Sequence, residues 1–277
     1  MDFRAILRAC DDQIWGQRVK LLRHASADYD LSLVERSGFL REYEERQGKP
    51  ILDRTDVVLS FLGERGSQAR FVGASRVGPA TPKPGPWPKA FPYPGMHPGN
   101  WRYQLERLPQ FDSMCDRLVI DWGGGRGFHQ HLRAKDMVEI RPVGFVGHFP
   151  GYEAVLLDFA ELQRLVANPT ANRVWHRMLS EVAGVYLIVD THSGTQYVGS
   201  AYGNRGILGR WASYCRTPHG NNRLLKELLE ANPGRHRSFQ FAILRTLPKT
   251  KTAREVIEVE SHLKRTLGTR AFGLNAN

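Results

Sequence analysis

The sequence predicts an α+β protein with a β-rich, barrel-like N-terminal domain, a helical bridge and a C-terminal α+β layer. Its 277 residues suit two domains of about 100–200 residues each. Several short strand-like runs separated by Gly and Pro turns fill the first half, which is typical of a small barrel or curved sheet. The last third alternates strand and helix patterns. We expect the domains to span residues 1–157, 158–182 and 183–277.

The N-terminal domain is expected to begin with amphipathic helices over residues 1–20, followed by a short helix at 40–47. A β-hairpin is predicted from residues 56–62 and 69–77, joined by a glycine-containing turn. Further short strands are predicted at residues 102–108, 118–122, 138–141 and 154–157. This pattern resembles the PUA-like and EVE-like barrels, and the resemblance implies binding of nucleic acid or modified bases.

A proline-rich loop is predicted between residues 78 and 99, with Trp87, Phe91 and Tyr93 interleaved among the prolines. Such a long loop is either a linker or a functional insertion. Its aromatic side chains have two interpretations: stacking on bases, or packing against the domain's own surface. We favour packing.

Two helices are predicted between the domains. Asp158 and Glu161 have the spacing of a capping box, which opens a helix that runs to Val166. A second helix is expected over residues 171–182. We interpret residues 158–182 as a helical bridge without a catalytic role.

The C-terminal domain is built around a predicted hairpin, with strands at residues 184–190 and 196–199 joined by a polar turn. Because residues two apart share a face of a strand, the hairpin can bring Tyr186 and Tyr197 to one surface. A helix over residues 206–215 would then place Arg210 and Tyr214, four apart, on one face. Further elements are expected: a helix at 224–231, a strand at 238–244, a helix at 252–267 and an extended segment at 271–275.

The ordered series Gly184-Val-Tyr186, Tyr197-Val-Gly199 and Arg210 resembles the motifs of the GIY-YIG nuclease family. The resemblance continues through His219, Glu260 and Asn275 and covers about the last third of the chain. It implies a three-stranded antiparallel sheet flanked by helices, and an endonuclease that hydrolyses phosphodiester bonds.

The resemblance also implies the roles of the site residues. Arg210 would stabilise the scissile phosphate, since a planar guanidinium matches phosphate oxygens. Either Tyr186 or Tyr197 would position or deprotonate the attacking water, and Tyr214 is a further candidate for the general base. His219 would contact phosphate or protonate the leaving oxygen. Asn275 would orient a tyrosine or a backbone group.

A divalent metal, Mg²⁺ or Mn²⁺, is the expected cofactor, because it lowers the pKa of bound water and clamps the phosphate. Magnesium takes one or two protein carboxylates and keeps several waters, so one glutamate suffices. The candidate ligand is Glu260, because the apolar Leu263 three positions on resembles the family's helix around its metal-binding glutamate. Glu258 is the alternative, and Glu255 is less favoured.

The charge distribution points to a nucleic-acid substrate. The net charge is +11, and residues 184–277 hold 14 Lys and Arg against 6 Asp and Glu, while the remainder carries only +3. Phosphate backbones attract such a surface through counterion release. DNA is the expected substrate, with restriction or phage defence as the context. An RNA nuclease and a catalytically inactive nucleic-acid-binding module remain alternatives.

The expected compartment is the cytoplasm. The chain has no run of about 18 or more apolar residues and no signal-peptide pattern at its start. Its three cysteines, Cys10, Cys115 and Cys215, are odd in number and far apart, which argues against a disulfide framework. No membrane partner is expected. Because one such active site cuts one strand, cutting a duplex requires a homodimer or sequential nicking.

Overall fold

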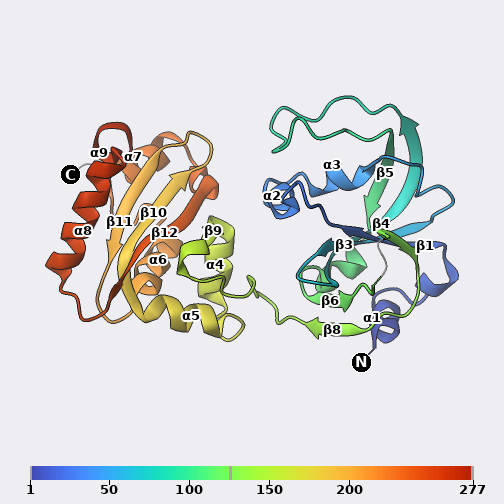
Figure 1. Ribbon diagram of the computed structural model, residues 1–277, viewed down its shortest axis with the longest axis horizontal. Coiled ribbons are helices and arrows are strands. Elements are labelled where there is room, and N and C mark those ends of the chain that lie inside the picture. Colours follow the sequence, from blue (N-terminus) through green and yellow to red (C-terminus); the bar gives the residue numbers. More distant parts are fainter. Residues whose placement is uncertain (1, 125–126, 276–277) are drawn as a thin grey trace. The chain divides into compact units, whose positions relative to one another are not determined.

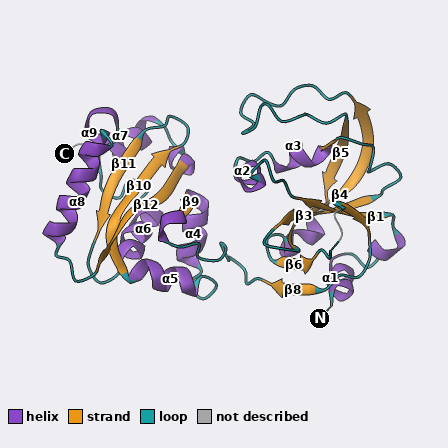
Figure 2. Ribbon diagram, viewed as in Figure 1, coloured by secondary structure: helices purple, strands orange, loops and turns teal. Residues whose placement is uncertain are grey.

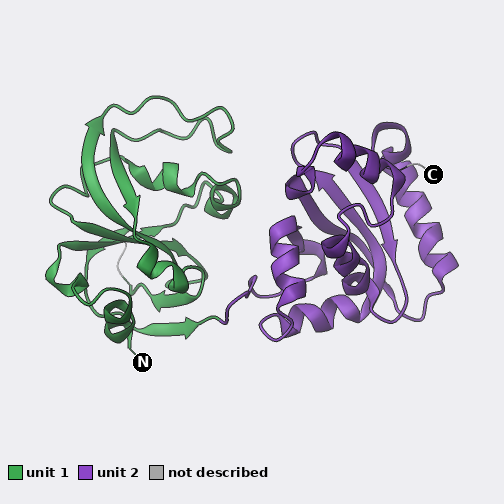
Figure 3. Cartoon of the chain, turned by 180° about the vertical axis from the view of Figure 1, so that it is seen from behind, with its two compact units in different colours: residues 1–141 green, residues 142–277 purple. Residues whose placement is uncertain are grey.

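A computed structural model describes residues 2–124 and 127–275, and the chain forms two compact units, residues 1–141 and 142–277 (Figures 1 and 3). Both units combine strands with helices (Figure 2), which confirms the α+β class. The division falls between Arg141 and Pro142, so the helices predicted as a bridge lie within the second unit.

Unit 1 contains most of the strands. Its helices are α1 (Phe3–Cys10), α2 (Leu31–Arg36) and α3 (Leu40–Glu45). Its strands are β1 (Val19–His24), β2 (Arg46–Gln47), β3 (Val57–Gly63), β4 (Gln68–Pro82), β5 (Trp101–Arg107), β6 (Leu118–Asp121), β7 (His129–His131) and β8 (Met137–Ile140).

The unit 1 strands form one eight-stranded sheet in the order β2-β5-β4-β3-β1-β7, with β6 pairing to β4 and β8. All pairs are antiparallel except β1 with β3. The long strand β4 pairs with β3, β5 and β6 at different points along its length and has a bulge between Val77 and Ala80. Because a bulge bends a strand and increases its twist, the sheet curls. The predicted barrel-like curvature is therefore present.

Strand β1 is missing from the sequence-based prediction, which extends helices to residue 20. The structure ends the helical segment at Gly16 and starts β1 at Val19. Lys20 and Arg23 interrupt the apolar run of this strand, which hides its pattern. Val19, Leu21 and Leu22 are nevertheless buried on both faces of the sheet, as expected for a central strand paired in parallel.

The proline-rich loop packs on unit 1 itself. Strand β4 continues to Pro82, so the loop begins five residues later than predicted. The rings of Trp87 and Phe91 are buried and stacked, with centroids 4.0 Å apart, and they join a hydrophobic cluster with α2 and α3. The packing interpretation of these aromatic residues is therefore correct, and the two rings have no exposed face for bases.

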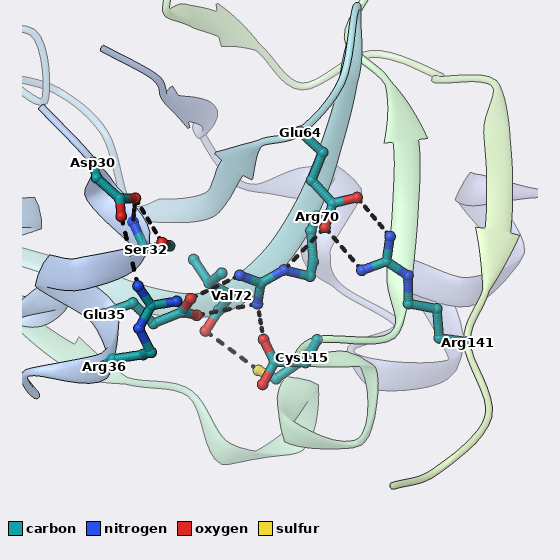
Figure 4. A network of polar contacts seen from close by, with 10 residues as sticks. Asp30, Ser32, Glu35, Arg36, Glu64, Arg70, Val72, Cys115 and Arg141 are labelled. Atoms are coloured by element: carbon teal, nitrogen blue, oxygen red, sulfur yellow. Dashed lines mark hydrogen bonds and ion pairs between the residues drawn. The ribbon is translucent and has the colours of Figure 1, made fainter. Parts of the chain in front are cut away.

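A network of ion pairs connects α2, β4 and the segments that follow β3 and β8 in unit 1 (Figure 4). Arg70 on β4 pairs with Glu35, Glu64 and Asp116. Glu64 also receives two bonds from Arg141, at 2.8 and 2.5 Å. Arg141 is the last residue of unit 1 and is only 6% exposed, so the network fixes the point at which the chain leaves this unit.

Unit 2 alternates helices and strands. Its strands are β9 (Leu156–Asp158), β10 (Val182–Asp190), β11 (Gln196–Ala201) and β12 (Phe239–Pro248). Its helices are α4 (Phe159–Ala167), α5 (Arg173–Ser180), α6 (Gly206–Arg216), α7 (Arg223–Ala231), α8 (Ala253–Thr266) and α9 (Thr269–Phe272). The capping box of Asp158 and Glu161 is present at the start of α4, as predicted.

The sheet of unit 2 has four antiparallel strands in the order β11-β10-β12-β9, rather than three. The extra strand β9 was expected at the end of the N-terminal sheet, but it pairs with Gln240–Ala242 of β12. Three residues carry too little pattern to reveal a partner so distant in the sequence. The C-terminal segment also differs, because α9 forms where only an extended chain was predicted.

The core of unit 2 draws on its strands and on α4, α5, α6 and α7. Trp175 and Leu179 of α5 are buried in it, and so are Ile207 and Trp211 of α6. The two helices predicted as a bridge are therefore part of this core. Apolar burial of this kind is the main stabilising contribution to a domain of this size. The strands and helices that carry the candidate site residues are thus held by one packed core.

Candidate active site

A cavity of about 620 Å³ lies in unit 2 beside strand β11. Strand β11 is an edge strand, and alternation along it places Tyr197 and Ser200 on opposite faces of the sheet. Both residues line the cavity, so the cavity spans the open edge of the strand. The other lining residues come mainly from α6, α8 and the loop before α7. They include Arg205, Arg210, Gly220, Asn221, Asn222, Glu260, Ser261, Lys264 and Arg270.

Arg210 reaches the cavity from α6 and is held from behind by two phenols. Its Nε donates to the Tyr186 hydroxyl at 3.1 Å, and its Nη2 lies 3.5 Å from the Tyr214 hydroxyl. Nη2 also donates to the Gly220 carbonyl at 3.1 Å. The two hydroxyls share a hydrogen bond of 2.9 Å. The structure therefore brings these three side chains together.

Burial sets the protonation of the two phenols behind Arg210. Tyr186 and Tyr214 are both fully buried. Burial, together with the neighbouring Tyr197, raises the pKa of Tyr186 despite the opposing charge of Arg210. Burial and the neighbouring Tyr186 likewise raise the pKa of Tyr214 well above its usual value. Both phenols are therefore neutral near pH 7 and act as hydrogen-bonding groups.

Tyr197 differs from the other two tyrosines because it lines the cavity. It is 6% exposed, and it faces the same side of the sheet as Tyr186, since Tyr186 pairs with Gly199 and Ile188 with Tyr197. The hairpin thus places both phenols on one surface, as the sequence indicates. Tyr197 is the one of the pair whose side chain a substrate in the cavity can contact.

Glu260 enters the cavity from α8. Its carboxylate accepts a hydrogen bond of 2.5 Å from the Ser200 hydroxyl and lies 2.8 Å from the Lys264 ammonium group. Glu260 and Lys264 are only 9% and 6% exposed. Ser200 and Lys264 are not among the site residues predicted from the sequence, although the spacing of four residues between Glu260 and Lys264 on a helix is a recognisable signal.

The other two glutamates of α8 lie elsewhere. Glu258 pairs with Arg254, and its side chain is 62% exposed. Glu255 caps the start of α8 by bonding Thr252, and the Lys251 ammonium group helps to lower the pKa of this carboxyl to about 2. Neither residue lines the cavity, whereas Glu260 does.

The Asn275 side chain hydrogen-bonds the backbone at the open edge of β11. Its side-chain amide donates to the Val198 carbonyl at 2.8 Å and accepts from the Val198 amide at 2.9 Å. Asn275 is 2% exposed and thus completes two backbone hydrogen bonds that an edge strand leaves open. The residue holds the backbone beside Tyr197.

His219 stands apart from the other candidates. It is half-buried, and its Nδ1 accepts a hydrogen bond of 3.0 Å from the Asn221 amide. Within the described part of the chain, the cavity lining includes its neighbours Gly220 and Asn221 but not His219 itself. Its side chain shapes the loop before α7.

The donor groups fit a hard divalent cation held by one protein carboxylate. Among the described residues, Glu260 is the one carboxylate of the cavity lining, and no group of three or more His, Cys, Asp or Glu gathers elsewhere to bind a metal. Mg²⁺ commonly binds through one or two carboxylates together with waters and substrate phosphates. The cavity provides that carboxylate beside several cationic side chains.

One family and two solved structures are similar to the C-terminal part of the chain. Residues 182–275 match the family described as GIY-YIG catalytic domain. Two solved structures are similar: the catalytic domain of homing endonuclease I-TevI and a variant of the catalytic domain of intron endonuclease I-TevI. Each is 21% identical, with a TM-score of 0.29; the matches cover 34% and 35% of this chain, and 98% and 94% of the respective structures. A search of curated proteins finds no match.

The family match extends from Val182 at the start of β10 to Asn275, and it therefore contains every candidate site residue. This part of the chain is a GIY-YIG catalytic domain. The match supports an endonuclease activity of the GIY-YIG type in this domain, acting on a nucleic acid.

Proposed function

We propose that the protein is a metal-dependent DNA endonuclease whose C-terminal unit hydrolyses phosphodiester bonds in the cavity beside β11. The observation that carries the proposal is the convergence of Arg210, Tyr197 and Glu260 on one cavity from three different elements. A guanidinium can stabilise charge on the phosphate, a carboxylate can hold one metal ion, and a phenol can position the attacking water.

In this proposal Glu260 holds Mg²⁺ or Mn²⁺. When bound, such an ion lowers the pKa of a coordinated water and offsets charge on the phosphate. Ser200 orients the Glu260 carboxylate, since its hydroxyl donates a hydrogen bond to it. One protein carboxylate leaves room for waters and for phosphate oxygens around the ion.

Arg210 binds the scissile phosphate and stabilises the charge that develops on its oxygens. Tyr186 and Tyr214 are positioning residues, because their hydroxyls contact Arg210 rather than the cavity. Tyr197 orients the attacking water through its hydroxyl. His219 would protonate the leaving oxygen or contact a neighbouring phosphate, and Asn275 keeps the backbone beside Tyr197 in place.

Unit 1 supplies substrate recognition in this proposal, with a particular DNA sequence, structure or modified base as the target. The support is architectural: unit 1 has its own curled sheet and its own hydrophobic clusters. Restriction of foreign DNA is the context we propose. The three cysteines are free, which suits a reducing cytoplasm.

Cleavage of supercoiled plasmid DNA tests this function. The full chain is incubated with Mg²⁺, Mn²⁺ or EDTA, and Glu260→Gln is compared with Glu258→Gln, a matched variant on the exposed face of the same helix. We expect metal-dependent nicking that falls by about a hundredfold or more in Glu260→Gln and stays at the wild-type rate in Glu258→Gln.

Other outcomes separate the alternatives. Loss of cleavage in Glu258→Gln alone would move the metal ligand to that residue. Because a recognition unit can demand a modified target, DNA with modified bases and RNA serve as further substrates. Cleavage of RNA alone would replace DNA as the substrate. Binding in gel shifts without cleavage of any of these would indicate an inactive binding module.

A further inference from the structure

Each oxygen of the Glu260 carboxylate has a partner within the protein. One of its oxygens accepts the Ser200 hydroxyl at 2.5 Å, and the other lies 2.8 Å from the Lys264 ammonium group. Glu260 and Lys264 lie one helical turn apart on α8, and Ser200 reaches them from β11. A metal ion that binds this carboxylate must therefore displace or share these contacts.

The burial of this ion pair makes its charges strongly coupled. The side chains of Glu260 and Lys264 are 12% and 8% exposed. Charges so far from water are retained because they are paired. Coulombic interactions near a protein interior are also several times stronger than in water. A divalent cation at Glu260 would consequently experience strong repulsion from Lys264.

The rest of the cavity adds to this repulsion. Arg210 lines the same cavity, and so do Arg205 and Arg270. Glu260 is the one acidic residue among the described residues of the lining. The cavity lining thus has an excess of positive charge. A nucleic-acid phosphate supplies negative charge, and its oxygens offer new partners for both Lys264 and a metal ion.

We infer that Lys264 competes with the divalent cation for the Glu260 carboxylate, so that the cation binds tightly only together with a nucleic-acid phosphate. This inference rests on the proposed role of Glu260 as the metal ligand. Metal and nucleic acid then increase each other's affinity by the same factor, because coupling between two binding sites is reciprocal. The free enzyme holds little metal and acquires it on its substrate.

Calorimetric titration of the full chain with Mn²⁺, in the absence of nucleic acid, tests this inference. We compare wild type with Lys264→Met, which keeps the apolar stem of the side chain but removes its charge. Lys251→Met is the matched control, because Lys251 pairs with Glu255 at the other end of α8, outside the cavity. We expect Lys264→Met to bind Mn²⁺ more tightly by about tenfold or more, and Lys251→Met to stay within about twofold of wild type.

A second titration, with a phosphorothioate duplex that resists cleavage, measures the coupling. The duplex should raise the Mn²⁺ affinity of wild type by a larger factor than that of Lys264→Met. Thermal melting confirms that each variant is folded. If Lys264→Met fails to fold, Lys264→Gln takes its place, since its amide still hydrogen-bonds Glu260.

Glu260→Gln separates the two proposals. If Glu260→Gln abolishes Mn²⁺ binding while Lys264→Met binds Mn²⁺ as weakly as wild type or more weakly, the competition is overturned and the proposed metal ligand stands. If Glu260→Gln binds Mn²⁺ with wild-type affinity, Glu260 is not the metal ligand. The competition by Lys264 for this carboxylate is then overturned as well.

Discussion

The hydrogen-bond partners of Arg210 are neutral, so they position its guanidinium without neutralising its charge. Its guanidinium contacts the hydroxyls of Tyr186 and Tyr214 and the carbonyl of Gly220. The raised pKa values of the two phenols keep them protonated, so neither neutralises the arginine. A carboxylate partner would offset part of that charge. The phenols instead fix the position of Arg210 and leave its charge for a phosphate.

This arrangement predicts the effect of Tyr186→Phe. Removing the hydroxyl leaves Arg210 Nε without its partner at 3.1 Å and lets the guanidinium shift. We expect the cleavage rate to fall by about 10- to 100-fold, since small misplacements of a positioned group are costly. The affinity for DNA should change little. Single-turnover cleavage and fluorescence anisotropy measure the two quantities.

The pH dependence distinguishes positioning from base catalysis. Because the pKa of Tyr186 is raised above its ordinary value of about 10, its hydroxyl does not titrate between about pH 6 and 9. The rate profile of Tyr186→Phe should therefore keep the wild-type shape at a lower level. A profile that loses one limb would instead identify Tyr186 as the general base. Tyr152→Phe is the control. It also removes a tyrosine hydroxyl of unit 2 that donates a partly buried hydrogen bond, here to the Met178 carbonyl.

At the scale of elements, the glycine of the second motif is required by the packing of the hairpin. A Cβ on Gly199 would lie 2.4 Å from the Tyr186 hydroxyl and 2.5 Å from the ring carbon that carries it. Gly220 has φ +52° and leaves only 2.4 Å between an added Cβ and the Tyr214 ring. The backbone thus approaches both phenols closely, as only glycine permits.

Gly199→Ala should consequently disturb the site through β11. The new methyl group must displace the Tyr186 ring, and overpacking of this kind costs about 1–3 kcal/mol of stability. We expect a lower melting temperature and a cleavage rate reduced by about tenfold or more, because Arg210 loses the same support as in Tyr186→Phe. Gly73→Ala in β4 is the control for a strand glycine, since nothing lies within 4 Å of its added Cβ. Equal melting temperatures for wild type and Gly199→Ala would show that the sheet adapts without cost.

The elements differ in how far the sequence predicts them. The hairpin of β10 and β11 and helices α6 and α8 follow from strong local patterns, and the candidate residues on them converge as expected. Strand β1 escapes prediction because its charged residues mask a doubly buried strand. A strand near β9 is predicted, but its pairing is not, because its partner β12 lies far along the chain. Lys264 and Ser200 escape because their role depends on the approach of α8 to β11, which no local pattern encodes.

At the scale of the whole molecule, the two units have separate cores. The core cluster of unit 2 draws only on residues from Val146 onward, within the described part of the chain. The GIY-YIG match also lies entirely within this unit. Among the described residues, no helix has the length and apolar character needed to cross a bilayer. The catalytic domain therefore has a core separate from that of unit 1.

The last prediction follows from that separation and concerns residues 142–277 expressed alone. Because this unit has its own core and contains the whole cavity, we expect it to fold and to nick plasmid in the presence of Mg²⁺ or Mn²⁺. Its binding should rest on phosphate contacts and weaken steeply between about 50 and 200 mM salt.

The unit alone should also discriminate less among DNA substrates than the full chain does. We expect the ratio of its cleavage rates on two substrates to be lower by about tenfold or more, since phosphate contacts carry no sequence information. Cleavage of matched plasmids with and without modified bases, by the full chain and by residues 142–277, measures this difference. Full-chain Glu260→Gln serves as the control, because it should retain selective binding without cleavage. If residues 142–277 keep the full selectivity, recognition lies in the catalytic unit, and unit 1 needs another role.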